Sequence, residues 1–158
     1  MSNRKCAITL QSEEETTAFA RQLAGILTAG DVLLLDGPVG TGKTHFARSL
    51  ILALLPQPED VPSPTFTLVQ TYAAKPFEIW HADLYRLTDS NEVIELGLTD
   101  AFDTALCLVE WPDRLSDLTP DNALTLAFAT PSGDDRRIVT ATWRDPRWDE
   151  RLGDVLND

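Results

Sequence analysis

One eight-residue segment constrains the fold of this chain more than any other part of its sequence. Residues 37–44 are GPVGTGKT, which fits the pattern G-x-x-x-x-G-K-[ST]. The segment follows a short apolar run at residues 31–36 (DVLLLD) and precedes helical apolar spacing over residues 44–55. A continuous apolar run of this length is typical of a strand buried on both faces. The sequence therefore predicts a strand, a glycine-rich turn and a helix in succession, the order found inside α/β sheets.

The residue types of this segment, a P-loop, suit the binding of phosphate groups. Glycines permit positive φ angles and let backbone N–H groups converge on an anion, and the N-terminus of the following helix adds partial positive charge. Lys43 supplies a mobile cation for β- and γ-phosphate oxygens, and the Thr44 hydroxyl is placed to ligate Mg²⁺. The predicted phosphate-binding residues are Gly37, Pro38, Val39, Gly40, Thr41, Gly42, Lys43 and Thr44. The alternative is a glycine turn that only connects the strand to the helix.

Two carboxylates are placed to complete such a site. A P-loop alone leaves Mg²⁺ under-ligated and supplies no residue that positions an attacking water. Asp83 ends the stretch FEIWHAD and Glu110 ends the apolar run ALCLVE. Both are therefore expected at the carboxyl edge of the sheet, where ligands of open α/β folds bind. The sequence does not choose which of the two positions water, and the alternative for each is a solvated charge at a strand end.

Two threonines follow the P-loop helix in the segment SPTFTLV. Thr65 and Thr67 come at the end of a proline-rich loop. A threonine in this place can approach the γ-phosphate or Mg²⁺, as a nucleotide-sensing switch residue does. A turn at Ser63 and Pro64 that leads into a strand explains the spacing equally well.

The remaining pattern predicts one domain over residues 1–158, with three layers and helices on both faces of a mixed central sheet. A first strand is expected at residues 6–10. Ser12 and Glu15 form a capping box that opens the next helix, and Gly30 is expected to end it.

An antiparallel pair makes the predicted sheet mixed. Residues 65–72 and 77–85 alternate in polarity around the turn-like AAKP. Further elements are expected as a short helix capped by Ser90 or Asn91 and ending at Leu96, a buried strand at 105–110, a hairpin of 123–128 with 138–143, and a helix from about Trp148.

Charge and composition restrict the partners of the chain. The formal net charge of the 158 residues is −12, so no sequence-independent affinity for nucleic acid is expected from this chain alone, and an RNA would have to be held by another protein. Cys6 and Cys107 form no metal-binding pattern and fit small buried thiols in a reducing compartment. No stretch has the length of a signal peptide or a membrane span, which favours a cytoplasmic protein without membrane contact.

Several motifs together resemble those of one family of small bacterial ATPases. GPVGTGKT, SPTFTLV, HADLYRL, ELGL and CLVEWP occur in the same order and similar spacing as in the TsaE (YjeE) family. The resemblance implies an ATPase that acts with the partners TsaB and TsaD in tRNA threonylcarbamoyladenosine biosynthesis. It also implies that the chain is not the transferase, that hydrolysis resets the partner complex, and that tRNA is met only through that complex.

The resemblance also assigns residues. It implies that residues 37–44 bind ATP or ADP, with Thr44, Asp83 and Glu110 on the Mg²⁺ side. Thr65 falls in the switch-like segment, and Trp111 follows the acidic residue at the nucleotide pocket. Arg136 or Arg137 approaches the nucleotide, and residues 12–16 line the adenine side; these two assignments fall where the motifs match least. The binding set thus also contains Thr65, Trp111 and Arg137, and the catalytic set is Lys43, Asp83 and Glu110.

Slow hydrolysis that a partner accelerates is the expected mechanism, because no arginine of the chain is an evident arginine finger. A small-molecule P-loop kinase is the main alternative, although the sequence lacks an arginine-rich lid. A GTPase would carry an N-K-x-D segment, which is absent. A nucleotide-gated scaffold without hydrolysis is a further alternative, against which the two carboxylates argue.

Overall fold

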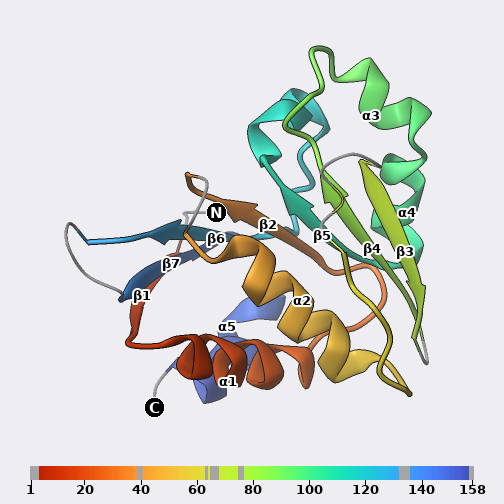
Figure 1. Ribbon diagram of the computed structural model, residues 1–158. Helices are drawn as coiled ribbons and strands as arrows, with labels where there is room; N and C mark the ends of the chain where they lie inside the picture. The colour runs from red at the N-terminus through yellow and green to blue at the C-terminus, as the bar shows by residue number, and fades with distance from the viewer. Residues whose placement is uncertain are drawn as a thin grey trace.

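A computed structural model describes residues 4–38, 41–62, 64, 68–74, 77–131 and 136–156 of the chain. Within these residues the strands are β1 (Arg4–Leu10), β2 (Val32–Asp36), β3 (Val69–Ala73), β4 (Glu78–Asp83), β5 (Leu106–Glu110), β6 (Leu124–Ala129) and β7 (Arg137–Trp143). They form one sheet in the order β1-β7-β6-β2-β5-β4-β3 (Figure 1). β2, β4, β5 and β6 pair in parallel, whereas β1–β7, β6–β7 and β3–β4 are antiparallel. The predicted mixed sheet is confirmed.

The helices are α1 (Glu13–Ala24), α2 (Lys43–Leu54), α3 (Asn91–Glu95), α4 (Leu98–Thr104) and α5 (Arg147–Leu156), with a 3₁₀ segment η1 (Pro112–Leu118). Among the described residues, no helix has the length and apolar character that a membrane crossing requires. The sequence analysis did not predict α4 and η1. Both are short, and each begins after a residue with a left-handed backbone, Gly97 or Trp111, at which the chain changes direction.

One predicted helix end is wrong, and one predicted cap lacks its side-chain hydrogen bond. α1 begins as expected, with the Ser12 hydroxyl accepting from the Glu15 N–H, but it ends at Ala24 and not at Gly30. The chain leaves the helix early because the Asp31 carboxylate accepts the backbone N–H of Thr28 at 2.7 Å. Ser90 is the N-cap residue of α3, as predicted, but its side chain makes no capping hydrogen bond, and the Asp89 carboxylate accepts the Asn91 N–H instead.

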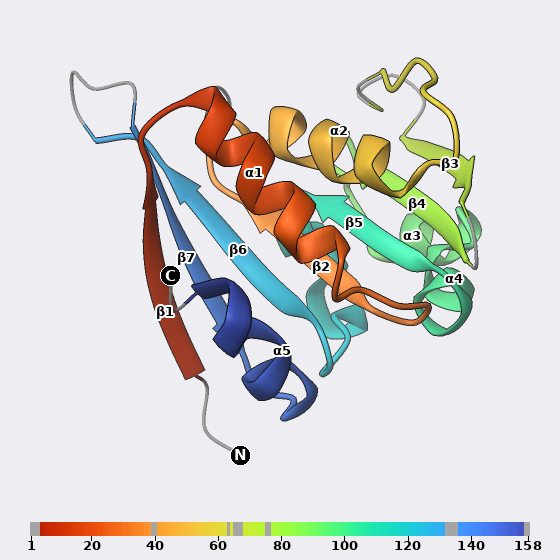
Figure 2. The ribbon, with the colours of Figure 1, turned by 90° about the horizontal axis from the view of Figure 1, so that it is seen from below.

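Helices cover both faces of the sheet, which confirms the three-layer prediction. α1, α2 and α5 lie on one face (Figure 2), and α3, α4 and η1 lie on the other (Figure 1). Side chains of a strand point alternately to the two faces. Leu33 and Leu35 of β2 therefore join the core beneath α1 and α2, while Val32 and Leu34 join the core beneath α4. This double burial explains why β2 reads as a continuous apolar run.

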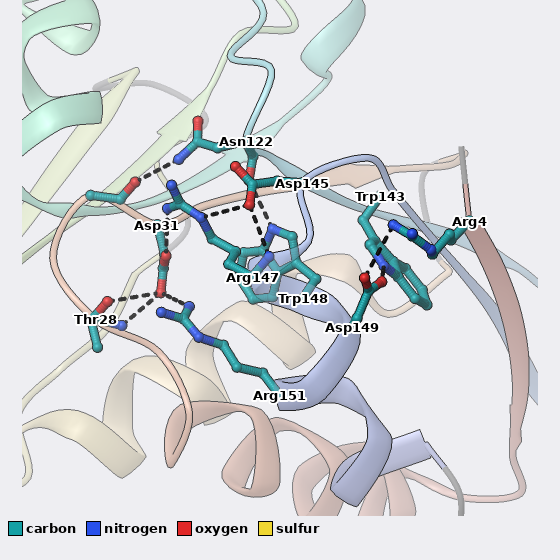
Figure 3. Close-up of polar contacts among 11 residues, drawn as sticks. Arg4, Thr28, Asp31, Asn122, Trp143, Asp145, Arg147, Trp148, Asp149 and Arg151 are labelled. Carbon is teal, nitrogen blue, oxygen red and sulfur yellow. Dashed lines mark hydrogen bonds and ion pairs between the residues drawn. The ribbon is translucent and has the colours of Figure 1, made fainter. Parts of the chain in front are cut away.

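The C-terminal helix α5 is fixed to the amino end of β2 by a buried carboxylate. Asp31 is fully buried, and its two oxygens lie 3.3 Å from Arg147 and 2.8 Å from Arg151 (Figure 3). The same carboxylate accepts from Thr28. Beside this cluster the Trp148 indole donates to the carbonyl of Asn122 at 2.8 Å. These contacts lie at the end of β2 opposite the P-loop.

Candidate functional site

The P-loop connects β2 to α2 through backbone conformations that only glycine adopts readily. Gly37 has φ +130°, and a Cβ there would lie 2.3 Å from the carbonyl oxygen of Phe128, so no side chain fits. Gly42 has φ +94° and opens α2. Val39 and Gly40, which the sequence analysis includes among the phosphate-binding residues, lie outside the described residues.

The N-terminus of α2 is built to receive an anion. Its N-cap residue is Gly42, no described side chain makes a capping hydrogen bond there, and its first turn contains no acidic residue. α1, by contrast, has a serine cap and three glutamates in its first turn. The serine hydroxyl accepts a hydrogen bond from one of the free N–H groups, and the glutamates neutralise the partial positive charge of the helix N-terminus. The first N–H groups of α2 and its partial positive charge therefore remain available to a phosphate group.

Lys43, the predicted cation of the site, is buried behind the P-loop and is 5% exposed. Its ammonium donates to the Gly37 carbonyl at 2.5 Å and lies 4.0 Å from the ring centroid of Trp111. Burial lowers the pKa of Lys43 from its ordinary value, and nearby carboxylates oppose that shift, namely Glu110, Asp36, Asp83 and Asp113. The charge is thus enclosed by acidic groups and an aromatic face.

Trp111 reaches this position through an unusual backbone. Its φ of +59° places a bulky residue in the left-handed region, directly before Pro112, where an extended conformation is normal. The indole packs against Tyr85 at a centroid distance of 4.9 Å on one side of Lys43. The structure therefore brings Trp111 to the P-loop lysine, the neighbourhood to which the family resemblance assigns it.

Glu110 and Thr44 meet at the carboxyl edge of the sheet. The Thr44 hydroxyl donates to one carboxylate oxygen of Glu110 at 3.2 Å. The other oxygen lies 2.7 Å from Nε2 of His81, on the neighbouring strand β4. Glu110 is only 3% exposed. Two predicted Mg²⁺ ligands thus lie within hydrogen-bonding distance although they are 66 residues apart in the chain.

Asp83 lies beside Glu110, because the parallel register of β4 and β5 pairs the two residues. One of its carboxylate oxygens accepts the Tyr85 N–H at 3.0 Å, and its own N–H donates to the Leu68 carbonyl at 2.8 Å. The second contact connects the end of β4 to the segment that precedes β3. Thr65 and Thr67 of that segment lie outside the described residues, so their predicted switch role stays a prediction.

The oxygen donors at this edge fit a magnesium ion that binds together with phosphate groups. Among the described residues, no group of three or more His, Cys, Asp or Glu side chains could hold a metal by itself. Mg²⁺ usually takes one or two protein oxygens and completes its shell with waters and substrate phosphates. A hydroxyl from Thr44 and a carboxylate from Glu110 match that pattern.

Arg137 lies beside Gly42, the last glycine of the P-loop. A Cβ on Gly42 would lie 3.5 Å from its Nε. Of the two arginines in the prediction, Arg137 is the one that lines a cavity of about 410 Å³ together with Ser12 and Glu13. The structure therefore brings together two segments, residues 12–16 and the start of β7, that the resemblance assigns to the nucleotide.

His81 belongs to this site by its contacts, although the sequence analysis places it in neither the binding set nor the catalytic set. Its contact is with Glu110, and both side chains are almost fully buried. The signal was available, since residues two apart in a strand share a face and His81 precedes Asp83 by two.

Comparisons with known proteins show the family and the fold of the chain. A family profile described as "Threonylcarbamoyl adenosine biosynthesis protein TsaE" matches residues 10–138, a range that contains every predicted site residue. A protein of Rickettsia bellii (strain RML369-C), named tRNA threonylcarbamoyladenosine biosynthesis protein TsaE, is 39% identical over 133 residues, which are 84% of this chain and 92% of that protein.

A relative of the same name from Bacillus subtilis (strain 168) is 37% identical over 130 residues, or 82% of this chain and 80% of the relative. The crystal structure of Bacillus subtilis YdiB superposes with a TM-score of 0.81 at 28% identity, covering 98% of this chain and 96% of that one. The likeness thus extends from the sequence to the whole arrangement of strands and helices.

Proposed function

The chain belongs to the TsaE family, and from this premise we propose that it is a Mg²⁺-dependent ATPase that supports tRNA threonylcarbamoyladenosine formation. One observation carries the proposal. The P-loop residue Thr44 and the strand-end carboxylate Glu110 are in contact, 3.2 Å apart, directly beside the buried cation Lys43. A glycine turn with a purely connecting role needs neither a buried lysine nor a carboxylate at this place.

Binding of ATP or ADP is assigned to the P-loop. The uncapped N–H groups of α2 and the Lys43 ammonium bind phosphate oxygens, which requires Lys43 to leave the Gly37 carbonyl. Trp111 stays beside Lys43 and excludes water from one side of it. Arg137 and residues 12–16 bind the remainder of the nucleotide. Thr65 remains the proposed contact to the terminal phosphate.

Thr44 and Glu110 are the residues that would hold Mg²⁺. When bound, the ion supplies positive charge that stabilises the phosphate oxygens during cleavage. Asp83, whose carboxylate lies at the same edge in register with Glu110, orients the attacking water. The contact of Glu110 with the Thr44 hydroxyl supports this division, because it brings the carboxylate to the hydroxyl that the P-loop pattern assigns to the metal.

Hydrolysis by the isolated chain is proposed to be slow. Arg137 lies against Gly42 at the start of α2, where it suits binding. The accelerating group is therefore assigned to the partner complex of TsaB and TsaD, which hydrolysis resets between turnovers. With a net charge of −12 the chain meets tRNA through this complex in the cytoplasm.

The test is ATP turnover with labelled γ-phosphate, measured for the purified chain alone and with the partner complex. We expect release of phosphate to water, accelerated by about 10³- to 10⁵-fold by the partners. Equal rates would remove partner activation, and label on a small metabolite would favour a kinase. Addition of the chain to an extract that lacks this activity should restore threonylcarbamoyladenosine formation.

A further inference from the structure

His81 is a buried polar residue of the site to which the proposed mechanism gives no role. It lies on β4 between Ile79 and Asp83, on the face of the sheet that α2 covers, and it is 1% exposed. Ile79, two residues earlier on the same face, belongs to the apolar core. An apolar residue would therefore be the expected occupant of this position.

The contacts of His81 converge on Glu110. In the parallel register His81 pairs with Leu108, so Glu110 is its diagonal neighbour on β5. Nε2 of His81 lies 2.7 Å from one oxygen of Glu110, and an N–H donates there when Glu110 is a carboxylate. The Thr44 hydroxyl binds the other oxygen. Two partners from different elements thus fix the plane of the carboxylate.

A competing partner lies close by. Glu110 exerts the strongest electrostatic attraction of any carboxylate on the buried ammonium of Lys43. A buried carboxylate that loses a hydrogen bond moves to the nearest cation, because an unpaired charge in the interior is costly. Without His81, Glu110 is expected to turn from Thr44 to Lys43, which would occupy both the metal ligand and the phosphate-binding cation.

The rest of the imidazole argues against a purely structural role. Nδ1 of His81 is buried and has no hydrogen-bond partner among the described residues. A buried polar atom without a partner destabilises a fold, so a histidine here stabilises the structure less than an apolar residue of similar size. The contact made by Nε2 is what accounts for a histidine at this position.

We propose that His81 is a positioning residue that holds Glu110 beside Thr44 and away from Lys43, so that the two oxygen donors are preorganised for a divalent cation. This inference rests on the proposed function for the identity of the ligand. Residues that orient metal ligands typically change metal affinity by about 10- to 100-fold when they are replaced. The larger consequence is expected for the metal, since within the described part of the chain the side-chain contact of His81 is with Glu110 and not with the P-loop.

The experiment measures binding of a fluorescent ADP analogue as a function of Mg²⁺ concentration and, separately, in excess chelator. His81→Leu should raise the Mg²⁺ concentration at which nucleotide binding is half-maximal by about tenfold or more. The affinity in excess chelator should fall by a clearly smaller factor, because Glu110 beside Lys43 weakens the phosphate-binding cation but leaves the backbone N–H groups of α2 in place. His81→Gln retains a side-chain N–H donor and should restore most of the Mg²⁺ response. His81→Phe, a ring without a donor, serves if His81→Leu does not fold.

Two controls separate positioning from packing. Tyr72→Phe, on β3, removes another buried polar atom without a described partner and should leave both affinities unchanged. In a Glu110→Gln background, His81→Leu should have no further effect, because the residue through which it acts is already altered. Equal losses with and without Mg²⁺, or additive effects of the two substitutions, would overturn the proposal.

A crystal structure of the metal-free His81→Leu protein keeps this inference separable from the proposed function. If the wild type binds no nucleotide, the proposed function fails, yet the position of Glu110 still decides the role of His81. Glu110 should leave hydrogen-bonding distance of the Thr44 hydroxyl, about 3.5 Å, and approach Lys43. A carboxylate that stays beside Thr44 without His81 would refute the positioning role.

Discussion

Single residues of the site are held in backbone conformations that most side chains do not tolerate. Gly37 has no room for a Cβ, and Trp111 keeps a left-handed backbone in front of a proline. Such conformations are costly and persist where surrounding contacts fix them. At Trp111 this backbone conformation places the face of the indole against the Lys43 ammonium. Strain at these residues thus coincides with the proposed phosphate-binding loop.

Gly37→Ala should destabilise the fold strongly. The new methyl group would meet the Phe128 carbonyl on β6 at 2.3 Å, and φ of +130° is unfavourable for alanine. We expect a loss of at least about 2 kcal/mol in the free energy of unfolding, measured by urea denaturation. Gly25→Ala is the matched control, since φ there is −70° and its Cβ would make an ordinary 3.5 Å contact. Equal stability of the two variants would contradict the geometry.

Lys43→Ala should largely abolish ATP binding, because it removes the cation enclosed behind the P-loop. The measurement is equilibrium titration with a fluorescent ATP analogue, for which we expect a loss of about 100-fold or more in affinity. Lys5→Ala, at an exposed position on β1, is the control and should bind as the wild type does. Undiminished binding by the Lys43 variant would place the phosphates elsewhere.

Glu110→Ala should separate binding from turnover. The P-loop N–H groups and Lys43 remain, so ATP binding stays measurable, while hydrolysis should fall by about 10²-fold or more because the metal-side carboxylate is lost. Phosphate release under saturating ATP is the readout. Glu95→Ala, at an exposed position of α3, serves as the control. Unaltered turnover would remove Glu110 from the site.

The attachment of α5 to the sheet depends on one buried carboxylate, that of Asp31. Asp31 precedes β2 and binds two arginines of α5, whose side chains are 37% and 29% exposed. Because these arginines remain partly hydrated, the pairs are worth less than fully buried ones, but the carboxylate itself is inaccessible. The helix therefore stabilises the start of the strand whose other end carries the P-loop.

Asp31→Ala should loosen α5 without affecting the nucleotide site. We expect roughly 2 kcal/mol or more of destabilisation, since a carboxylate with two cations and the Thr28 N–H is removed. Hydrogen exchange should accelerate over residues 147–156, whereas ATP affinity should be unchanged. Glu150→Ala removes an exposed carboxylate of the same helix and should shift stability by no more than about 0.5 kcal/mol. Protection of α5 equal to that of the wild type would show that Asp31 does not anchor it.

Element types followed from local sequence more reliably than element ends. The P-loop helix was predicted to within one residue, because an apolar stripe and a following proline define it. α1 was predicted too long, because its end is set by the contact of Thr28 with Asp31 and not by Gly30. Side-chain contacts of this kind depend on where the chain turns, which apolar spacing does not encode.

For the molecule as a whole, the two cores meet at β2 and β5, the strands that carry the P-loop and Glu110. Cys107 on β5 is fully buried within the core beneath α4. Burial raises the pKa of its thiol to about 12, with the charge of Glu78 adding to the shift. Any reagent that reaches this thiol must first open the centre of the sheet.

Thiol labelling of the native protein near pH 8 should therefore modify Cys6 and spare Cys107. The thiolate is the reactive form, and Cys107 is both inaccessible and protonated at this pH, whereas Cys6 on the edge strand β1 is partly exposed. Mass spectrometry should find one label in buffer and two in denaturant. Cys6→Ser should leave the native protein unlabelled, and rapid labelling of Cys107 would mean that the sheet opens locally.

The candidate site shows the same division between what could and could not be predicted. Lys43, Thr44 and Glu110 follow from a motif and from a strand end, since both are local patterns. The bond between His81 and Glu110 does not, because it depends on the parallel register of β4 with β5. The position of Arg137 beside Gly42 likewise requires β7 to begin next to the P-loop.

By itself the sequence determined the chemistry that is available: a phosphate-binding turn between a buried strand and a helix, and carboxylates at strand ends. It could do so because periodicity, glycines and charge act over a few neighbouring residues. Only the tertiary structure decided which of these groups meet. Distances between residues far apart in the chain are set by strand order and register, and these place Glu110 between Thr44 and His81, with Trp111 against Lys43.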